Sequence, residues 1–155
     1  MNIAIDYVMS YLQDRNIDKL ESTLADNCVV CLIGNGKRQC RIDENGSEIP
    51  KIQTKEELLR HFRQIFMYKL KPVKIRELHY CMLGDGEYKI NVISEQSREE
   101  FPANCVNDTI TFKVKEDKII SVEHNFEVTR PGWSEEELER SRALYEELCE
   151  KYETC

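Results

Sequence analysis

Asp108 and His124 stand out because each interrupts an otherwise apolar face on a segment with strand-like alternation. Side chains repeat every second residue along a strand, so Asp108 shares a face with Val106, Ile110, Phe112 and Val114. In the same way, His124 shares a face with Ile120, Val122, Phe126 and Val128. A carboxylate buried on such a face costs several kcal/mol unless it is paired, protonated or hydrated. These two residues are therefore the first candidates for chemistry.

The turn at Lys115 to Lys118 predicts that the two segments form a hairpin. A register that pairs Ile110 with His124 makes Asp108 a diagonal neighbour of His124 on the other strand, with ~7–8 Å between their backbone positions. An imidazole oriented by a carboxylate is a general base near neutral pH, suited to proton abstraction beside a carbonyl, dehydration or cyclisation. The alternative is a structural pair that holds the fold together, and a register slip of one residue would separate the two groups.

Tyr7 and Tyr11 lie four residues apart on a predicted helix and therefore share one of its faces. A phenol that points inward can donate a hydrogen bond to a ligand, whereas the alternative is core packing with the hydroxyl at the rim. We predict that Tyr7 acts with Asp108 and His124 as the catalytic set. The predicted pocket is lined by the aromatic residues Tyr11, Phe62, Phe66, Phe112 and Phe126.

Other polar residues carry weaker signals. His79 lies on a strand with ambiguous alternation, and His61 lies between arginines, which predicts a solvated ring. Cys28 and Cys31 have the spacing of a zinc-ligand pair, but no second pair follows, and residues three apart on a strand face opposite sides. We predict neither a metal site nor a cofactor.

Hydrophobic periodicity predicts the elements that position these residues. Helices are expected from Ile3 to Gln13, from Ile17 to Leu24, from Thr54 until before Pro72, and from Ser134 to about Tyr152. Strands are expected over Cys28 to Ile33, Arg38 to Ile42, Val73 to Leu83, Glu87 to Ser97 and the hairpin Asn104 to Val128. This order predicts an α+β fold, in which a strongly bent, mostly antiparallel sheet wraps around the N-terminal helices as a cone with an open mouth.

Length and charge limit the function classes. A chain of 155 residues predicts one α+β domain over residues 1–133, followed by an acidic amphipathic helix over 134–155 that packs on it. The net charge of −7 disfavours nucleic acid as a partner. No segment approaches the ~18 apolar residues of a membrane span, and no signal peptide is apparent. Seven cysteines, an odd number, indicate thiols in a reducing compartment, so we expect a cytoplasmic protein.

Two stretches carry a family resemblance: Ile17-Asp-Lys-Leu-Glu-Ser-Thr-Leu-Ala-Asp-Asn-Cys-Val-Val30, and Asp108-Thr-Ile-Thr-Phe112 with Lys118-Ile-Ile-Ser-Val-Glu-His124. They resemble the nuclear transport factor 2-like superfamily, in particular its SnoaL-like polyketide cyclase and ketosteroid isomerase branches. The resemblance covers roughly residues 3–128. It implies a cone-shaped fold, a pocket for a small molecule, and a homodimer formed through the outer face of the sheet.

Compared with ketosteroid isomerases, the resemblance is partial at the functional positions. Asp108 matches the acid that helps to bind an oxyanion, four residues before the hairpin phenylalanine. The general base falls on Leu32, and the oxyanion tyrosine falls on Val8, next to Tyr7. We therefore expect a non-catalytic domain that binds a small apolar molecule or a partner. The alternative is a cofactor-free isomerase, cyclase or dehydratase acting on a small apolar carbonyl or cyclic compound.

Overall fold

A computed structural model describes residues 2–38, 40–67, 72–98 and 100–152, together with the side chains of these residues except those at 41, 67, 145 and 148–152. Four helices are present in this part of the chain: α1 (Ile3–Leu12), α2 (Ile17–Thr23), α3 (Lys55–Met67) and α4 (Glu135–Tyr152). The strands are β1 (Leu24–Gly34), β2 (Lys37–Arg38), β3 (Cys40–Ile42), β4 (Glu48–Pro50), β5 (Lys74–Gly84), β6 (Glu87–Gln96), β7 (Asn104–Lys115) and β8 (Lys118–Thr129). Residues 68–71, where the helix was predicted to stop before Pro72, lie outside the described part.

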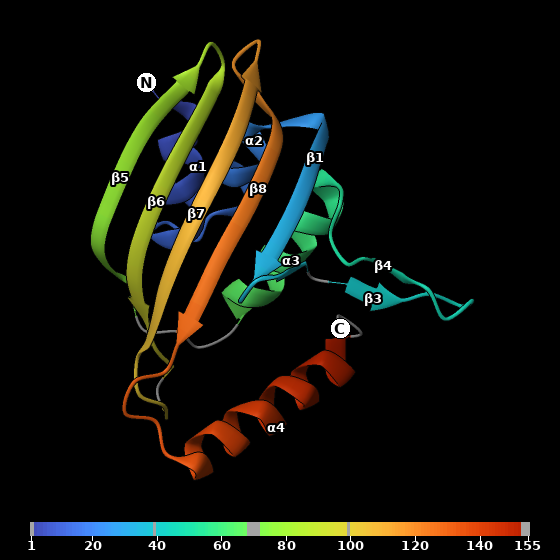
Figure 1. Cartoon of the computed structure of the whole chain (residues 1–155), viewed down its shortest axis with the longest axis vertical. Coiled ribbons are helices and arrows are strands. Elements are labelled where there is room, and N and C mark those ends of the chain that lie inside the picture. Colours follow the sequence, from blue (N-terminus) through green and yellow to red (C-terminus); the bar gives the residue numbers. More distant parts are fainter. Residues whose placement is uncertain (1, 39, 68–71, 99, 153–155) are drawn as a thin grey trace.

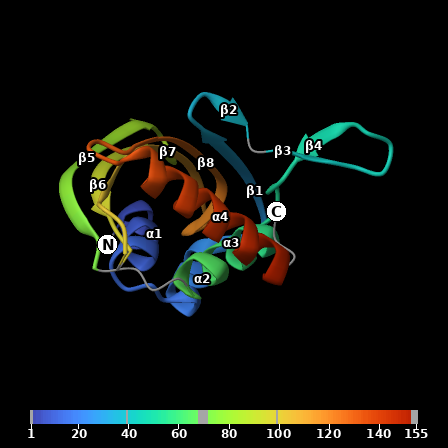
Figure 2. The same ribbon diagram turned by 90° about the horizontal axis from the view of Figure 1, so that it is seen from below.

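Six strands form one curled sheet in the order β2-β1-β8-β7-β6-β5 (Figure 1). Neighbours from β8 to β5 are antiparallel, while β1 pairs with β8 in parallel, so the sheet is mixed. Seen from below, the sheet curves around α1, with α2 and α3 completing the inner layer (Figure 2). The predicted α+β fold with a bent sheet around the N-terminal helices is confirmed.

The hairpin of β7 and β8 has the register that alternation predicted. Ile110 pairs with His124, and Asp108 pairs with Phe126. Asp108 and His124 are both buried, which confirms that each side chain faces the interior of the cone. The register is strongly specified because a shift of one residue would expose the whole apolar face of either strand.

Side-chain caps fix where the helices begin. Asn2 Oδ1 accepts a hydrogen bond from the backbone of Ala4, and α1 follows. At α4, Ser134 Oγ accepts from the Glu137 amide while the Glu137 carboxylate accepts from the Ser134 amide, which confirms the predicted capping box. Each cap satisfies a backbone donor that has no partner within its helix.

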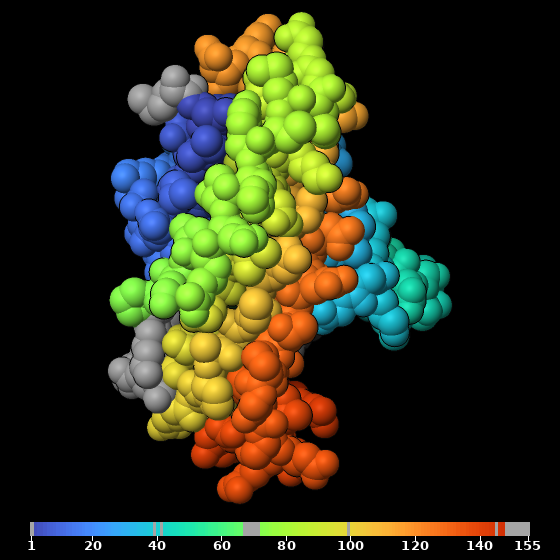
Figure 3. Space-filling model, turned by 60° about the vertical axis from the view of Figure 1, so that its left-hand side comes forward, coloured from blue at the N-terminus to red at the C-terminus, as the bar shows by residue number. Residues whose placement is uncertain are grey.

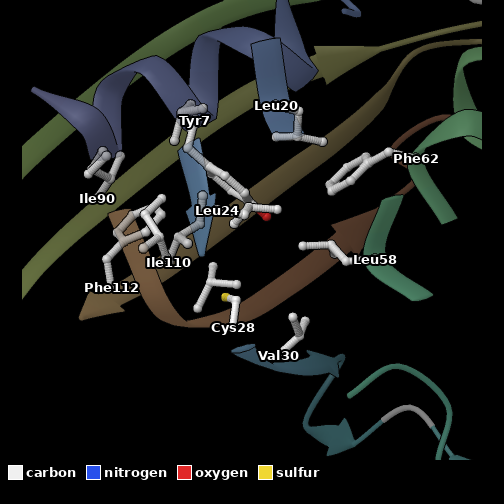
Figure 4. Packing of buried hydrophobic residues seen from close by; sticks show 14 of the residues in the cluster. Tyr7, Leu20, Leu24, Cys28, Val30, Leu58, Phe62, Ile90, Ile110 and Phe112 are labelled. Carbon is white, nitrogen blue, oxygen red and sulfur yellow. The ribbon is translucent and has the colours of Figure 1, made fainter. Parts of the chain in front are cut away.

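The core lies between α1 and the concave face of the sheet (Figure 4). Tyr7 is completely buried there, edge-on to Phe112, with ring centroids 5.4 Å apart. Leu20 from α2 and Leu58 from α3 close the same core. Because side chains at i and i+4 share a helix face, this packing turns Tyr7 and Tyr11 together toward β7 and β8.

One predicted strand was wrong in part. The segment from Arg38 to Ile42 was expected to form a single strand, but only Lys37 and Arg38 pair with β1, as β2. Residues 40–42 instead form a separate two-stranded ribbon with β4, because the turn at Asp43 to Ser47 returns the chain on itself. This ribbon projects from the body of the molecule (Figures 2 and 3).

Gly86 offers a test of the turn between β5 and β6. Its φ is +72°, and a Cβ atom built there lies 2.7 Å from the carbonyl oxygen of Val114. Gly86→Ala should lower the free energy of unfolding by about 2 kcal/mol, measured by urea denaturation, because the backbone must move to relieve this contact. Gly36→Ala is the matched control, since its φ is +80° but nothing lies within 4 Å of the added Cβ. An equal loss in both variants would contradict the role of the Val114 contact.

Candidate functional site

Four buried or partly buried polar side chains form a continuous hydrogen-bond network inside the cone. Tyr7 Oη lies 2.7 Å from His124 Nε2, and His124 Nδ1 lies 2.9 Å from Asp108 Oδ2. Tyr11 donates its hydroxyl proton to the same Asp108 oxygen at 3.2 Å. The network joins helix α1 to strands β7 and β8, which are about a hundred residues later in the chain.

Burial decides which of these groups carry protons. Desolvation first, and then the nearby Asp108 charge, raise the pKa values of Tyr7 and Tyr11 well above the ordinary value for a phenol. Both phenols are therefore protonated donors at neutral pH. We assign the Tyr7 proton to His124 Nε2, which makes the imidazole a neutral acceptor there and a donor from Nδ1 to Asp108.

A cavity of about 270 Å³ opens beside this network. Its wall is mainly apolar and comes from α1, β1, α3, β7 and β8, with Tyr11, Leu32, Phe62, Phe66, Val106, Phe126 and Val128 among the lining residues. Asp108 and His124 also line it. Asp108 Oδ1 is buried and accepts no hydrogen bond from the residues that the structure describes. An acceptor left in this state is a reason to expect a ligand or water at that atom.

Some of the predicted site residues line the cavity, and others are buried behind its wall. Tyr11, Phe62, Phe66 and Phe126 line the cavity, as do Asp108 and His124. Phe112 does not, contrary to expectation, because it pairs with Val122 deeper in the sheet and Tyr7 covers it. Tyr7 is also fully buried, so it contacts His124 from behind and does not line the cavity.

The geometry changes the role that His124 can play. We expected its ring to act as a base toward a ligand, but Nδ1 contacts Asp108 and Nε2 contacts Tyr7. Both ring nitrogens are thus engaged within the protein. Within this network, Asp108 Oδ1 has no hydrogen-bond partner among the described residues, and the imidazole serves to orient that carboxylate.

His61 belongs to this cavity, and the prediction of a solvated ring was wrong. It lies on α3 edge-on to Phe62 and lines the same wall. Burial, followed by the nearby His124 and Lys51, lowers the pKa of His61 to about 4. The available signal was its spacing, three residues after Leu58 and four before Ile65, which places it on the apolar stripe of the helix.

The other weak candidates are distributed over the surface and the core. His79 is exposed on β5 beside Glu77, away from the cavity. Cys28 is buried while Cys31 is partly exposed, as expected for residues three apart on a strand. Among the described residues, no group of three or more His, Cys, Asp and Glu side chains is placed to hold a metal ion.

None of the described helices combines the length and the apolar character needed to cross a membrane.

Comparison with known proteins finds similarity in structure only. No protein-family model matches the sequence, and neither does any curated protein. One similar solved structure is a protein provisionally assigned as a polyketide cyclase from Pseudomonas putida KT2440, with a TM-score of 0.57, 10% identity, and coverage of 88% of this chain and 92% of the other.

Two further solved structures agree with the first. An NTF2-like protein from Burkholderia xenovorans LB400 has a TM-score of 0.56 and 9% identity. The match covers 80% of this chain and 86% of that protein. A ketosteroid isomerase-like protein from Erwinia carotovora atroseptica SCRI1043 has a TM-score of 0.54 and 13% identity. The match covers 83% of this chain and 92% of that protein. Identities this low carry the fold and not the activity. Together with the bent sheet around α1, these matches show that the chain has the nuclear transport factor 2-like fold shared by SnoaL-like and ketosteroid isomerase-like proteins.

Proposed function

We propose that the cone binds a small, mainly apolar molecule that donates a hydrogen bond to Asp108. One observation carries the proposal: Asp108 lines a mainly apolar cavity, and one oxygen of its buried carboxylate has no hydrogen-bond partner among the residues that the structure describes. Tyr11 and His124 hold the other oxygen, so the carboxylate is already oriented before a ligand arrives. Orientation in advance reduces the entropy lost on binding.

Indole and N-methylindole form a matched pair of probes for this proposal. Both rings are small enough for a cavity of about 270 Å³, but only indole has an N–H to donate. In Asp108→Asn the hydrogen bond loses its charge, so indole affinity should fall about tenfold, since bonds to charged groups contribute ~1.5–3 kcal/mol. Affinity for N-methylindole should not change. Both affinities can be measured by NMR titration.

The outcomes separate the elements of the proposal. If indole shifts no resonance of cavity residues such as Phe62 and Val128, the cone is not a binding site for a molecule of this kind. If Asp108→Asn weakens both probes equally, the loss comes from a disturbed cavity rather than from the hydrogen bond. Thermal unfolding of the variant provides the control for its fold.

A second candidate function is proton transfer without a cofactor, as in an isomerase, cyclase or dehydratase. It is favoured by the same free carboxylate oxygen, with His124 and Tyr11 holding its partner oxygen. In this function Asp108 Oδ1 takes a proton from the carbon beside a carbonyl, and the bonding electrons form an enolate that is later reprotonated. Deuterium uptake into cyclohexanone above the rate in buffer, lost in Asp108→Asn, would support it. Uptake no faster than in buffer would oppose it.

We further propose a cytoplasmic homodimer that pairs through the outer face of the sheet. Its support is the resemblance of the fold, together with an outer face where Asn91 donates hydrogen bonds to Asn107 and Thr109. The division of the chain into residues 1–133 and an added helix over 134–155 also remains a proposal. No nucleic acid or membrane partner is part of it.

A further inference from the structure

A second cavity adjoins the mouth of the cone. Its volume is about 180 Å³, and it shares Ile65 and Gln96 with the first cavity, so the two cavities are neighbours. Its remaining wall comes from residues after β6, before β7 and after β8, and from α4. The lining residues are Ile65, Gln96, Ser97, Arg98, Phe101, Pro102, Asn104, Arg130, Trp133 and Ser141. We refer to this second cavity as the vestibule.

The described lining of the vestibule differs in charge from the chain as a whole. The whole chain carries −7, whereas the described residues that line the vestibule include Arg98 and Arg130 and no acidic side chain. Among the residues that the structure describes, no carboxylate forms an ion pair with Arg130. Asn104 Oδ1 is buried at the same wall without a hydrogen-bond partner there. Rotation of this amide presents N–H donors instead.

Aromatic stacking holds the cationic wall in place. The rings of Phe101 and Trp133 stack with centroids 5.5 Å apart, and the Trp133 indole donates to the Ala103 carbonyl at 3.2 Å. The Arg130 guanidinium lies 5.4 Å from the centre of the Trp133 ring. Arg130 is thereby oriented by a flat surface that leaves its N–H groups available.

Helix α4 contributes to this wall and is fixed near it. Arg140 lies over the Phe101 ring at 4.9 Å and donates to the Glu100 carbonyl at 3.0 Å, while Ser141 lines the vestibule. Viewed from below, α4 crosses the lower end of the sheet (Figure 2). The C-terminal helix therefore helps to form a chamber outside the mouth of the cone.

We infer that the vestibule binds the carboxylate end of a ligand whose apolar end occupies the cone. The inference rests on the proposed function and narrows the ligand to a small apolar acid. Guanidinium groups bind planar carboxylates through paired N–H donors, and Arg130 provides these in a cavity next to the cone. Asp108 would repel a carboxylate placed next to it in the cone, and the described lining of the vestibule has no acidic side chain that would do so.

The test compares 4-(indol-3-yl)butanoate with 4-(indol-3-yl)butan-1-ol, which share the ring and chain and differ only at the terminal group. In the wild-type protein the acid should bind about tenfold more tightly than the alcohol. Arg130→Gln should remove most of this preference and leave the affinity for the alcohol unchanged. Arg130→Lys should restore part of it, because lysine keeps the charge but not the paired donors.

Arg142→Gln is the matched control, since it removes one positive charge from an exposed position on α4 that does not line the vestibule. It should leave the preference for the acid intact. If the acid and the alcohol bind equally to the wild-type protein, the vestibule inference fails while the proposed function stands. If neither compound nor indole binds, the proposed function fails and the inference falls with it. If Arg142→Gln reduces the preference as much as Arg130→Gln, general charge and not the vestibule accounts for it.

Discussion

His124→Ala should lower the free energy of unfolding by about 3–5 kcal/mol, the largest loss expected for any single change in the site. Removing the ring deprives Tyr7, which is completely buried, of its acceptor. It also removes a donor from the buried Asp108 carboxylate and leaves a space in the core. Each of these effects destabilises the folded state independently. Urea denaturation of the two proteins measures the difference.

A double-mutant cycle separates the hydrogen-bond network from simple loss of packing. Asp108→Ala and His124→Ala should show a coupling energy of about 2 kcal/mol, because the second change costs less once the partner is gone. His79→Ala is the control, since this exposed ring lies 3.4 Å from Glu77 on the surface and should contribute less than about 0.5 kcal/mol. Additive losses for Asp108 and His124 would contradict a network that acts as a unit.

The hairpin shows how far local sequence determines this site. Alternation along β7 and β8 identifies the inward face, and one pairing between Ile110 and His124 then places Asp108 within side-chain reach of the ring. These are consequences of the two-residue period of a strand. The helix spacing of Tyr7 and Tyr11 similarly predicts that both rings face the same strands.

The rest depends on contacts between distant segments, which local patterns do not contain. The choice between Tyr7 and Tyr11 as the residue that lines the cavity depends on how deeply α1 lies in the cone. The parallel pairing of β1 with β8 joins residues about ninety positions apart. It brings Leu32 opposite His124. Leu32 occupies the position where ketosteroid isomerases have their general base, and here it forms part of the apolar wall of the cavity. No periodicity in either strand indicates this partner.

The vestibule illustrates the same limit for charged residues. Arg98 and Arg130 are separated by two strands in the sequence. Arg98 lies between Ser97 and Glu99, and Arg130 precedes Pro131 and Gly132, as is typical of solvated loops and turns. Only the return of β8 beside the loop before β7 places both at one cavity. Trp133 then supplies a surface against which Arg130 is held. An arginine in a loop carries no signal of such a partner until the chain is folded.

Because of His61, the free energy of unfolding should decrease as the pH falls from about 6.5 to about 4. Burial lowers the pKa of its ring to about 4 in the folded protein, compared with 6.5 for an ordinary histidine. Between these values the unfolded chain binds a proton that the folded chain does not, so acid favours unfolding. The contribution is fully present above pH 6.5 and amounts to at most about 3 kcal/mol, because one pKa unit corresponds to ~1.4 kcal/mol.

His61→Gln isolates this contribution, because glutamine keeps a polar side chain at the position but does not titrate. The variant and the wild-type protein should have similar stability at pH 7, and the variant should become the more stable of the two by up to about 3 kcal/mol as the pH approaches 4. Groups that titrate in both proteins cancel from this difference. His79→Gln should show no such trend, since its ring is exposed in the folded state. A constant difference between His61→Gln and the wild-type protein across this range would mean that the His61 ring is solvated, and that the cavity wall beside Phe62 is open to water at this point.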